Sequence, residues 1–234
     1  MEILPIATFH SPFTSKFGIP KQSGVVEQLQ GTIILEPNYR HADALRGIED
    51  FDFLWLLWEF SANPHECKSL LVRPPRLGGN EKVGVFASRS PFRPNRLGLS
   101  SVRLSHIDWQ ASQGPIIHVL GGDLMEGTPI YDIKPYIAYA DAHVDARSGF
   151  VDQRQWHHLK VELSAETNNW LHEHGLNDLA VSQLKQVLEE DPRPQYQNNP
   201  QKVYGMPFLG VDVHFKVADG VLTVLHPKIR QITR

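Results

Sequence analysis

The sequence predicts a mainly β protein, in which a single β-barrel domain is followed by a small α+β unit at the C-terminus. Seventeen prolines and seventeen glycines in 234 residues indicate many turns, which favour a β-rich architecture over a helical bundle. Up to about residue 150 the chain consists mainly of short runs of β-branched and aromatic residues between turn residues. Beyond that point helical periodicity appears, so we predict two domains, residues 1–148 and 149–234.

Six runs in the first domain have the length and composition of strands, and they cover residues 3–9, 31–36, 53–60, 83–88, 98–106 and 115–120. A short helix is predicted at residues 40–46, because Gly47 follows it as a stop. Strands at this spacing are typical of a closed barrel or of a sandwich. Of these two architectures we favour the barrel.

The second domain carries two helices and a β-hairpin in its pattern. Ser164 can cap a helix that runs to residue 174, and a second amphipathic helix covers residues 179–191. Residues 211–217 alternate between apolar and polar side chains, and the pair Asp219-Gly220 that follows predicts a tight turn into a second strand. The tail is therefore predicted to be a compact α+β unit.

Composition excludes several classes of protein. Hydrophobic residues make up 41% of the chain and charged residues 21%, which is typical of a globular protein with an ordinary core. The longest apolar run covers residues 53–58 and is too short to cross a bilayer, so we expect no membrane partner. The N-terminus lacks the pattern of a signal peptide and Cys67 is the single cysteine, so we expect a cytoplasmic protein without disulfides. His65 and Cys67 have no second ligand pair, so we expect no metal site.

The arginine loop, residues 89–96, is the most informative feature of the chain, because it brings Arg89, Arg93 and Arg96 together. Residues 70–103 carry a net charge of +6, whereas the rest of the chain carries −9. Guanidinium groups bind carboxylates and phosphates through two parallel hydrogen bonds, and two prolines stiffen this loop. The alternative is a solvated loop whose arginines pair with acids elsewhere. We favour an anion-binding loop.

Three other motifs have both a functional and a plain structural interpretation. A glycine-rich turn places Asp123 and Glu126 where they could accept hydrogen bonds from a nucleoside, or it simply connects two strands. Asp132 could act as a base at the end of a strand, although a surface ion pair with Lys134 is the commoner arrangement. Residues 191–196 hold an acid, an arginine and a tyrosine between prolines, and chemistry alone favours a linker there.

Together, four motifs resemble the TsaA-like family, also called TrmO. They are VRPPRLGGN (72–80), GVFASRSPFRPN (84–95), DLMEGTPIYDIKPY (123–136) and DPRPQY (191–196). Members of this family are S-adenosylmethionine-dependent tRNA methyltransferases that modify the N6 of N6-threonylcarbamoyladenosine, next to the anticodon of threonine tRNAs. The resemblance implies a single barrel that binds S-adenosylmethionine, a tRNA partner and a homodimer.

The resemblance also implies where the cofactor contacts lie. They fall on Ser23, Gly24, Val25, Ser61, Ala62, Arg89, Leu99, Asp123, Leu124, Met125 and Glu126. Family relatives carry a histidine where this chain has Ser61, so the contact at this position departs from the family pattern. The methyl donor already contains a good leaving group, and the implied chemistry therefore needs no metal.

The implied reaction suggests roles for six further residues. The nucleophilic nitrogen must lose a proton, and we predict Asp132 as the base, with Tyr131 or Tyr196 positioning it. Tyr196 could also stack on a splayed RNA base. The substrate nucleoside carries a threonyl carboxylate, which Arg93, Arg96 or Arg193 could bind as a fork. The other arginines would then hold phosphates of the anticodon loop.

Two rival functions stay open at this point. A non-catalytic RNA-binding barrel would need the basic loop but would have no use for the glycine-rich acidic turn. A methyltransferase acting on a small metabolite would need the turn but not the basic surface. The main hypothesis requires that Arg89 and Asp123, which lie in different motifs, meet in one pocket.

Overall fold

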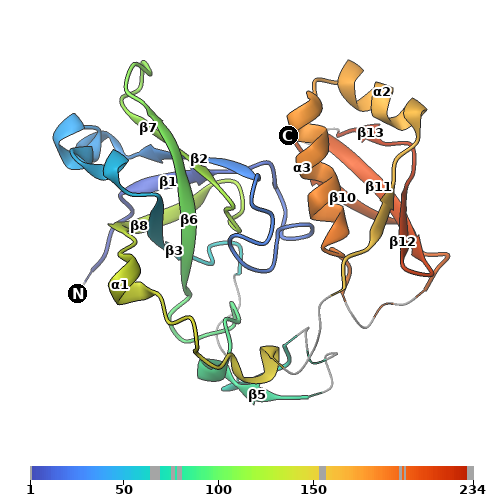
Figure 1. Cartoon of the computed structure of the whole chain (residues 1–234), viewed down its shortest axis with the longest axis horizontal. Coiled ribbons are helices and arrows are strands. Elements are labelled where there is room, and N and C mark those ends of the chain that lie inside the picture. The colour runs from blue at the N-terminus through green and yellow to red at the C-terminus, as the bar shows by residue number, and fades with distance from the viewer. Residues whose placement is uncertain are drawn as a thin grey trace.

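The computed structural model describes residues 2–63, 69–74, 77, 81–152, 157–194, 197 and 199–230. Figure 1 shows two bodies, one built from the N-terminal strands and the other from the C-terminal helices and strands. Strands outnumber helices among the described elements, so the predicted mainly β class is confirmed. None of the described helices combines the length and the hydropathy that a bilayer span requires.

The first body is a sheet of six antiparallel strands that closes on itself. In order around the barrel they are β1 (Ala7–His10), β2 (Gln30–Leu35), β7 (Ile116–Leu120), β6 (Leu97–Asp108), β3 (Phe53–Glu59) and β8 (Thr128–Pro135). The ring is closed by β8, which pairs with β1 through Ala7 and Ile130. Along β2 and β3 every second residue is buried, because successive side chains of a strand point to opposite faces. The buried side chains include Phe9 on β1, Ile33 on β2 and Leu56 on β3, which belong to the barrel core.

Two local predictions in this body need correction. Only Val83–Gly84 (β5) of the predicted strand 83–88 is extended, and it pairs with β4 (Leu71–Val72) outside the barrel. The chain then turns through a 3-10 helix, Val85–Ala87. The predicted helix at 40–46 is also shorter, a 3-10 turn at Ala42–Leu45. Other short helices are Pro37–Tyr39, Ile48–Asp50, Gly149–Val151 and α1 (Ala138–Asp141).

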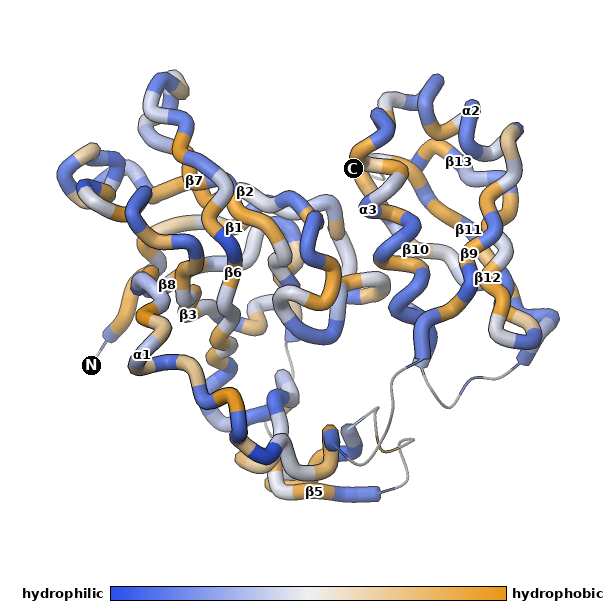
Figure 2. The backbone as a smooth tube through the Cα atoms, in the orientation of Figure 1, coloured by the Kyte–Doolittle hydropathy of each residue, from blue (hydrophilic) through white to orange (hydrophobic). Residues whose placement is uncertain are grey.

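The second body packs two helices on a five-stranded sheet. The helices are α2 (Ala165–Glu173) and α3 (Asp178–Glu189). The sheet has the order β10 (Tyr204–Phe208), β11 (Val211–Ala218), β12 (Val221–Val224) and β9 (Lys160–Glu162), with β13 (Lys228–Ile229) also paired to β11. Figure 2 shows hydrophobic residues alternating with hydrophilic ones along α3, as expected for a helix with one buried face.

Two signals in the C-terminal sequence are confirmed by their geometry. The Ser164 side chain accepts a hydrogen bond from the backbone N–H of Thr167, which is the predicted helix cap. Asp219 and Gly220 have φ angles of +50° and +76°, the left-handed conformation that a tight hairpin turn requires at both central positions. Local sequence chemistry therefore determines these two boundaries.

The β1–β2 loop, residues 11–29, leaves the barrel and completes the core of the second body. Phe13 is fully buried there, with its ring 5.7 Å from that of Phe208 in an edge-to-face contact. Phe17 stacks against Tyr204, with the ring centres 6.4 Å apart. The backbone joins the two bodies as well, because Leu209 N–H donates to the carbonyl of Pro12 at 3.1 Å. The core of the second body is thus shared between the N-terminal loop and the C-terminal unit, whereas the barrel has a separate core.

Candidate functional site

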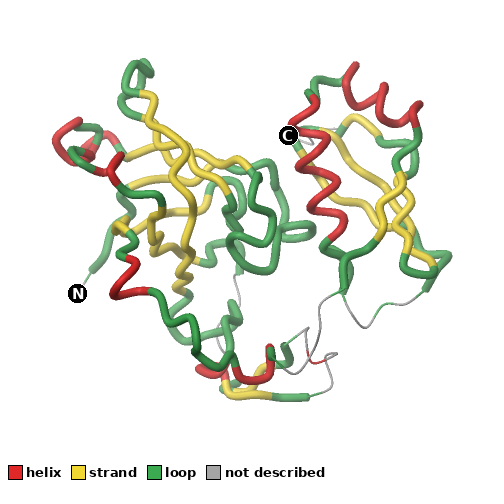
Figure 3. The backbone as a smooth tube through the Cα atoms, viewed as in Figure 1, coloured by secondary structure: helices red, strands yellow, loops and turns green. Residues whose placement is uncertain are grey.

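A cavity of about 500 Å³ lies where the barrel meets the β1–β2 loop and the arginine loop. Figure 3 shows loops gathered between the barrel strands and α3. The lining residues come from five segments: residues 16 and 19–22, residues 55 and 58–63, residues 88, 89, 91 and 93, residues 97–99, and residues 123, 125 and 128. This volume is within the range of small-molecule and cofactor sites.

Arg89 and Asp123 line this cavity together, as the sequence hypothesis required. Arg89 is close enough for its charge to act on the Asp123 carboxyl and lower its pKa. Behind them, the backbone N–H of Gly24 donates to the carbonyl of Gly121 at 2.8 Å, which ties the β1–β2 loop to the glycine-rich turn. The two loops are therefore held as one wall.

The Asp123 carboxyl is largely enclosed, and a short chain of hydrogen bonds orients it. Ser100 Oγ donates to Asp123 Oδ1 at 2.6 Å, and Trp58 Nε1 donates to Ser100 Oγ at 3.0 Å. Burial raises the pKa of Asp123, because the charged form loses hydration. The Ser100 hydroxyl, nearby backbone N–H groups including that of Ser23, and Arg89 act in the opposite direction. Such a carboxyl at a cavity wall is suited to binding a cationic ligand.

The predicted cofactor contacts divide into two groups. Those that line the cavity are Ser61, Ala62, Arg89, Leu99, Asp123 and Met125. The others, Ser23, Gly24, Val25, Leu124 and Glu126, are not among its lining residues. Leu124 is buried in the barrel core, and Glu126 accepts hydrogen bonds from His10 Nδ1 at 2.7 Å and from Ser11 N–H at 2.8 Å. These residues support the wall from behind.

The arginines that we predicted for substrate binding have different surroundings. Arg93 lines the cavity and donates to the carbonyl of Ser88 at 3.1 Å. Arg96 instead forms an ion pair with Glu59 at 2.9 Å. Arg193 donates to both carboxylate oxygens of Asp191, at 2.8 and 2.9 Å, and this pairing raises the pKa of Arg193. The guanidinium groups of Arg96 and Arg193 are thus each already paired with a carboxylate of this chain.

Of the two residues predicted for proton transfer, the structure describes only Asp132. Asp132 faces Lys134, with Oδ2 and Nζ 3.1 Å apart, and it is not among the cavity-lining residues. Its other oxygen accepts the backbone N–H of Ile133 at 3.0 Å. Tyr196 lies outside the described residues. Asp132 therefore forms the ion pair that the sequence offered as the alternative.

Several lining residues escaped the sequence analysis. Trp58 was interpreted as a core residue, and it is buried, but its ring edge also reaches the cavity. Lys16 and Gln22 line it from the β1–β2 loop, which the sequence marked only by the segment after Pro20. Ser100, which donates a hydrogen bond to Asp123 but is not itself a lining residue, lies within strand β6 and was also missed. Successive side chains along β6 alternate between its two faces, so that Ser100 points inward between buried Gly98 and Val102. This alternation was the signal that could have identified Ser100 as an inward-facing residue.

Among the described residues, His, Cys, Asp and Glu side chains do not gather in groups of three or more that could hold a metal ion. His65 and Cys67, which have a weak metal-like spacing, lie outside the described residues. The charged groups at the cavity are cationic side chains and the single enclosed acid, together with Glu59. This set is suited to organic ions rather than to a metal.

Gly98 is required for the position of Trp58. A Cβ atom at residue 98 would lie 2.4 Å from Cε2 of the Trp58 indole, so the ring would have to move. We expect Gly98→Ala to lower the free energy of unfolding by about 1–3 kcal/mol, as overpacked cores do. Urea denaturation measures the effect. Gly84→Ala is the control, because a Cβ there meets nothing within 4 Å; equal stability of the two variants would contradict the contact.

The fold and the cavity define a β-barrel protein with a cavity large enough for a small-molecule ligand and with a second unit of helices and strands beside the barrel. Comparison with known proteins identifies the family within this class of β-barrel proteins. The model of the tRNA-methyltransferase O N-terminal domain matches residues 8–142, and that of the TrmO C-terminal domain matches residues 157–228. The chain therefore belongs to the TrmO family.

Individual relatives resemble the chain over nearly its whole length. It is 36% identical to a tRNA (adenine(37)-N6)-methyltransferase of Escherichia coli, across 92% of both chains. A Pseudomonas aeruginosa relative named as an S-adenosylmethionine-dependent methyltransferase is 40% identical across 91% of both chains. The crystal structure of TrmO from Pseudomonas aeruginosa superposes with a TM-score of 0.79, at 32% identity and 97% coverage of both chains.

Proposed function

We propose that the protein transfers a methyl group from S-adenosylmethionine to the N6 of N6-threonylcarbamoyladenosine, next to the anticodon of threonine tRNAs. The observation that carries this proposal is the meeting of Arg89 and Asp123 in one cavity, in a chain of the TrmO family. Relatives over most of the chain are named as tRNA (adenine(37)-N6)-methyltransferases, which supports adenine N6 as the acceptor.

The cavity residues fit a methyl donor that is a cation. Asp123 offers a carboxylate, Met125 and Leu99 offer apolar surface, and Ser61 and Ala62 also line the cavity. S-adenosylmethionine supplies the methyl group on a sulfonium, which is already a good leaving group. The protein's own contribution is to hold donor and acceptor in line and to exclude water. The Trp58–Ser100–Asp123 chain of hydrogen bonds supplies the rigidity that this alignment requires.

The acceptor nitrogen must lose its proton as the new N–C bond forms. Asp132, our predicted base, is bound to Lys134 and could take the proton only after RNA binding separates that pair. We therefore assign it no step. Tyr131 is a poor acceptor as well, because its hydroxyl donates to Glu59 Oε2 at 2.6 Å, which raises its pKa to about 12.

The proposal extends to the organisation of the chain. Residues 1–148 would form a single barrel domain that binds the donor, and residues 149–234 the C-terminal domain, with the enzyme acting as a cytoplasmic homodimer. The net charge of +6 on residues 70–103 supports an RNA partner, since RNA binding depends on neutralising phosphates. Arg93 in the cavity wall and Tyr196 remain proposed substrate contacts.

One experiment tests the function directly. The protein is incubated with labelled S-adenosylmethionine and total tRNA from cells with or without the threonylcarbamoyl modification, and the labelled nucleoside is identified by mass spectrometry. We expect label only in the modified tRNA, on N6-threonylcarbamoyladenosine. Label in unmodified tRNA would overturn the substrate assignment. Label only in small metabolites would support the rival enzyme.

A thermal-shift measurement separates the non-catalytic binder from the enzyme. S-adenosylmethionine at about 100 times its Kd is expected to stabilise the protein by roughly 2.7 kcal/mol. A pure RNA binder would show no shift.

A further inference from the structure

The cations near the cavity differ in whether a carboxylate already neutralises them. Arg96 is paired with Glu59 and Arg193 with Asp191. By contrast, Lys16 lines the cavity and donates its ammonium to Asn63 Oδ1, an uncharged amide oxygen. Within the described part of the chain, no carboxylate lies within ion-pair distance of Lys16. An ammonium with only a neutral partner retains its full charge for a ligand.

Two independent elements hold Lys16 at this wall. Its chain neighbour Phe17 is stacked in the core of the C-terminal unit, on Tyr204 and on Phe215. Its hydrogen-bond partner Asn63 is buried, with 5% of its surface exposed, and the Asn63 carbonyl accepts Arg96 Nη1 at 3.2 Å. Lys16 is thus an exposed cation whose backbone and ammonium group are both held in place. A long lysine side chain that is ordered in this way loses less entropy on binding an anion.

The position of Lys16 suggests which anion it binds. Asp123 and Arg89 line the cavity from the glycine-rich turn and the arginine loop, whereas Lys16 and Asn63 line it from the β1–β2 loop and from the segment after β3, next to the predicted donor contacts Ser61 and Ala62. The nucleoside of the proposed reaction carries a carboxylate that unmodified adenosine lacks. A single ammonium is enough to distinguish the two, because an ionic hydrogen bond is stronger than a neutral one.

We propose that Lys16 binds the carboxylate of the modified nucleoside and selects the tRNA that carries it. Arg93, which donates to the uncharged Ser88 carbonyl, also lines this cavity. This inference rests on the proposed function, and it replaces Arg96 and Arg193 as the predicted carboxylate clamp. The carboxylate of the methyl donor and a backbone phosphate are the two other possible sources of the same charge.

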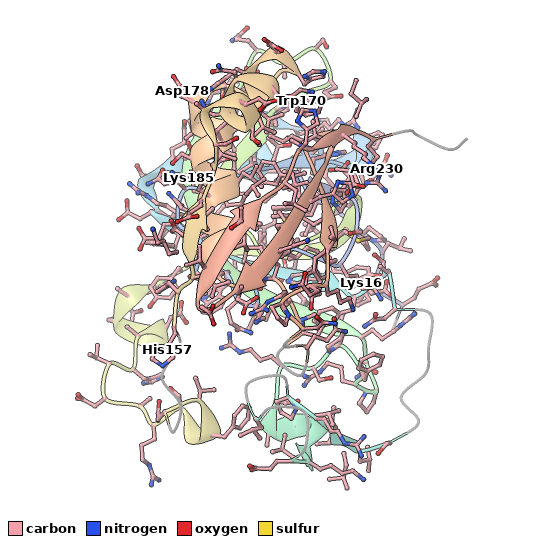
Figure 4. All side chains as sticks on the ribbon, turned by 90° about the vertical axis from the view of Figure 1, so that its right-hand side faces the viewer. Lys16, His157, Trp170, Asp178, Lys185 and Arg230 are labelled. Carbon is pink, nitrogen blue, oxygen red and sulfur yellow. The ribbon has the colours of Figure 1, made fainter. Side chains whose placement is uncertain are left out.

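The test compares Lys16→Gln and Lys16→Arg with Lys185→Gln. Lys185 is an exposed cation on α3 that is not among the cavity-lining residues, and Figure 4 shows it well apart from Lys16. The probes are two anticodon stem-loop RNAs, one with N6-threonylcarbamoyladenosine and one with the carboxamide analogue of its threonyl group. Methyl transfer, RNA binding by fluorescence anisotropy and donor binding by calorimetry are measured for each variant.

For the carboxylate RNA we expect Lys16→Gln to lower kcat/KM and to weaken binding by about 10- to 100-fold. Lys16→Arg should recover most of the loss, and Lys185→Gln should match the wild type. On the carboxamide RNA, wild type and Lys16→Gln should be equal, and the Kd for the donor should be unchanged. Equal losses on both RNAs with a reduced salt dependence would assign Lys16 to a phosphate, and a weakened donor Kd would assign it to the donor; either result overturns the inference.

The binding measurement keeps this inference separate from the proposed function. If the wild type transfers no methyl group to either RNA, the proposed function fails. The affinity difference between the two RNAs would still report on Lys16. Wild-type protein that binds both RNAs equally would show that Lys16 recognises no carboxylate.

Discussion

Replacing Phe13 with alanine is expected to lower the free energy of unfolding by about 3–5 kcal/mol, the cost of removing a buried aromatic ring. Phe13 lies in the β1–β2 loop near the N-terminus, but it is fully buried in the core of the C-terminal unit. Its ring contacts that of Phe208. The loss should therefore appear as a lower stability of the C-terminal unit, whose core contains Phe13. Thermal unfolding followed by near-UV circular dichroism measures it.

The same variant should also weaken donor binding, because the β1–β2 loop carries Lys16 and Gln22 to the cavity wall. The control is Leu222→Ala, which removes a fully buried residue of β12 from the same core. We expect Leu222→Ala to destabilise the protein by about 2–5 kcal/mol while leaving the donor Kd nearly unchanged at a temperature where both variants are folded. An unchanged donor Kd in folded Phe13→Ala protein would show that the loop does not depend on the shared core.

Replacing Asp123 with asparagine is expected to weaken S-adenosylmethionine binding by about 10- to 100-fold, the effect of losing a charged hydrogen-bond partner. The sign of the pH dependence follows from the raised pKa of Asp123, for which burial is the largest cause. Wild-type donor affinity should rise with pH through this raised pKa, because only the ionised carboxylate attracts a cation. Calorimetry between pH 4.5 and 8 would measure the profile, which should be flat for Asp123→Asn.

The free protein should show the opposite trend in stability. The folded state holds the Asp123 proton more tightly than the unfolded chain does, so this group's contribution to stability falls as pH rises from 3.8 through the raised pKa. Asp132→Asn is the control for both measurements, since Asp132 is paired with Lys134. A donor affinity that is independent of pH in the wild type, or equally weakened in Asp132→Asn, would remove Asp123 from the donor site.

The parts of the fold that the sequence predicted well are those that local chemistry determines. Ser164 caps its helix and Asp219-Gly220 forms its turn because each signal lies within four residues of the backbone it organises. The strand predicted at 83–88 was wrong beyond Gly84, because an apolar run does not reveal whether a strand has a partner. Only β4 was available there, and it is two residues long.

The site was predicted unevenly for a similar reason. Motifs supplied Arg89 and Asp123, and the structure brings them together as expected. The partner of each charge, however, depends on contacts between distant segments. Nothing in the sequence shows that Arg96 pairs with the carboxylate of Glu59, whereas the side-chain partner of Lys16 among the described residues is the amide of Asn63. Which cations are free to bind a substrate is therefore a property of the folded chain.

The shared core also has a consequence for the order in which the chain can mature during synthesis. The β1–β2 loop is among the first segments to be translated, but its packing partners follow much later, as with Gln28 and Gln183, which are hydrogen-bonded across 155 residues. Contacts of such high sequence separation form late in folding. A nascent barrel leaving the ribosome would thus carry an incomplete cavity with exposed phenylalanines, and it would gain a ligand-competent wall only after β10 and β11 have emerged.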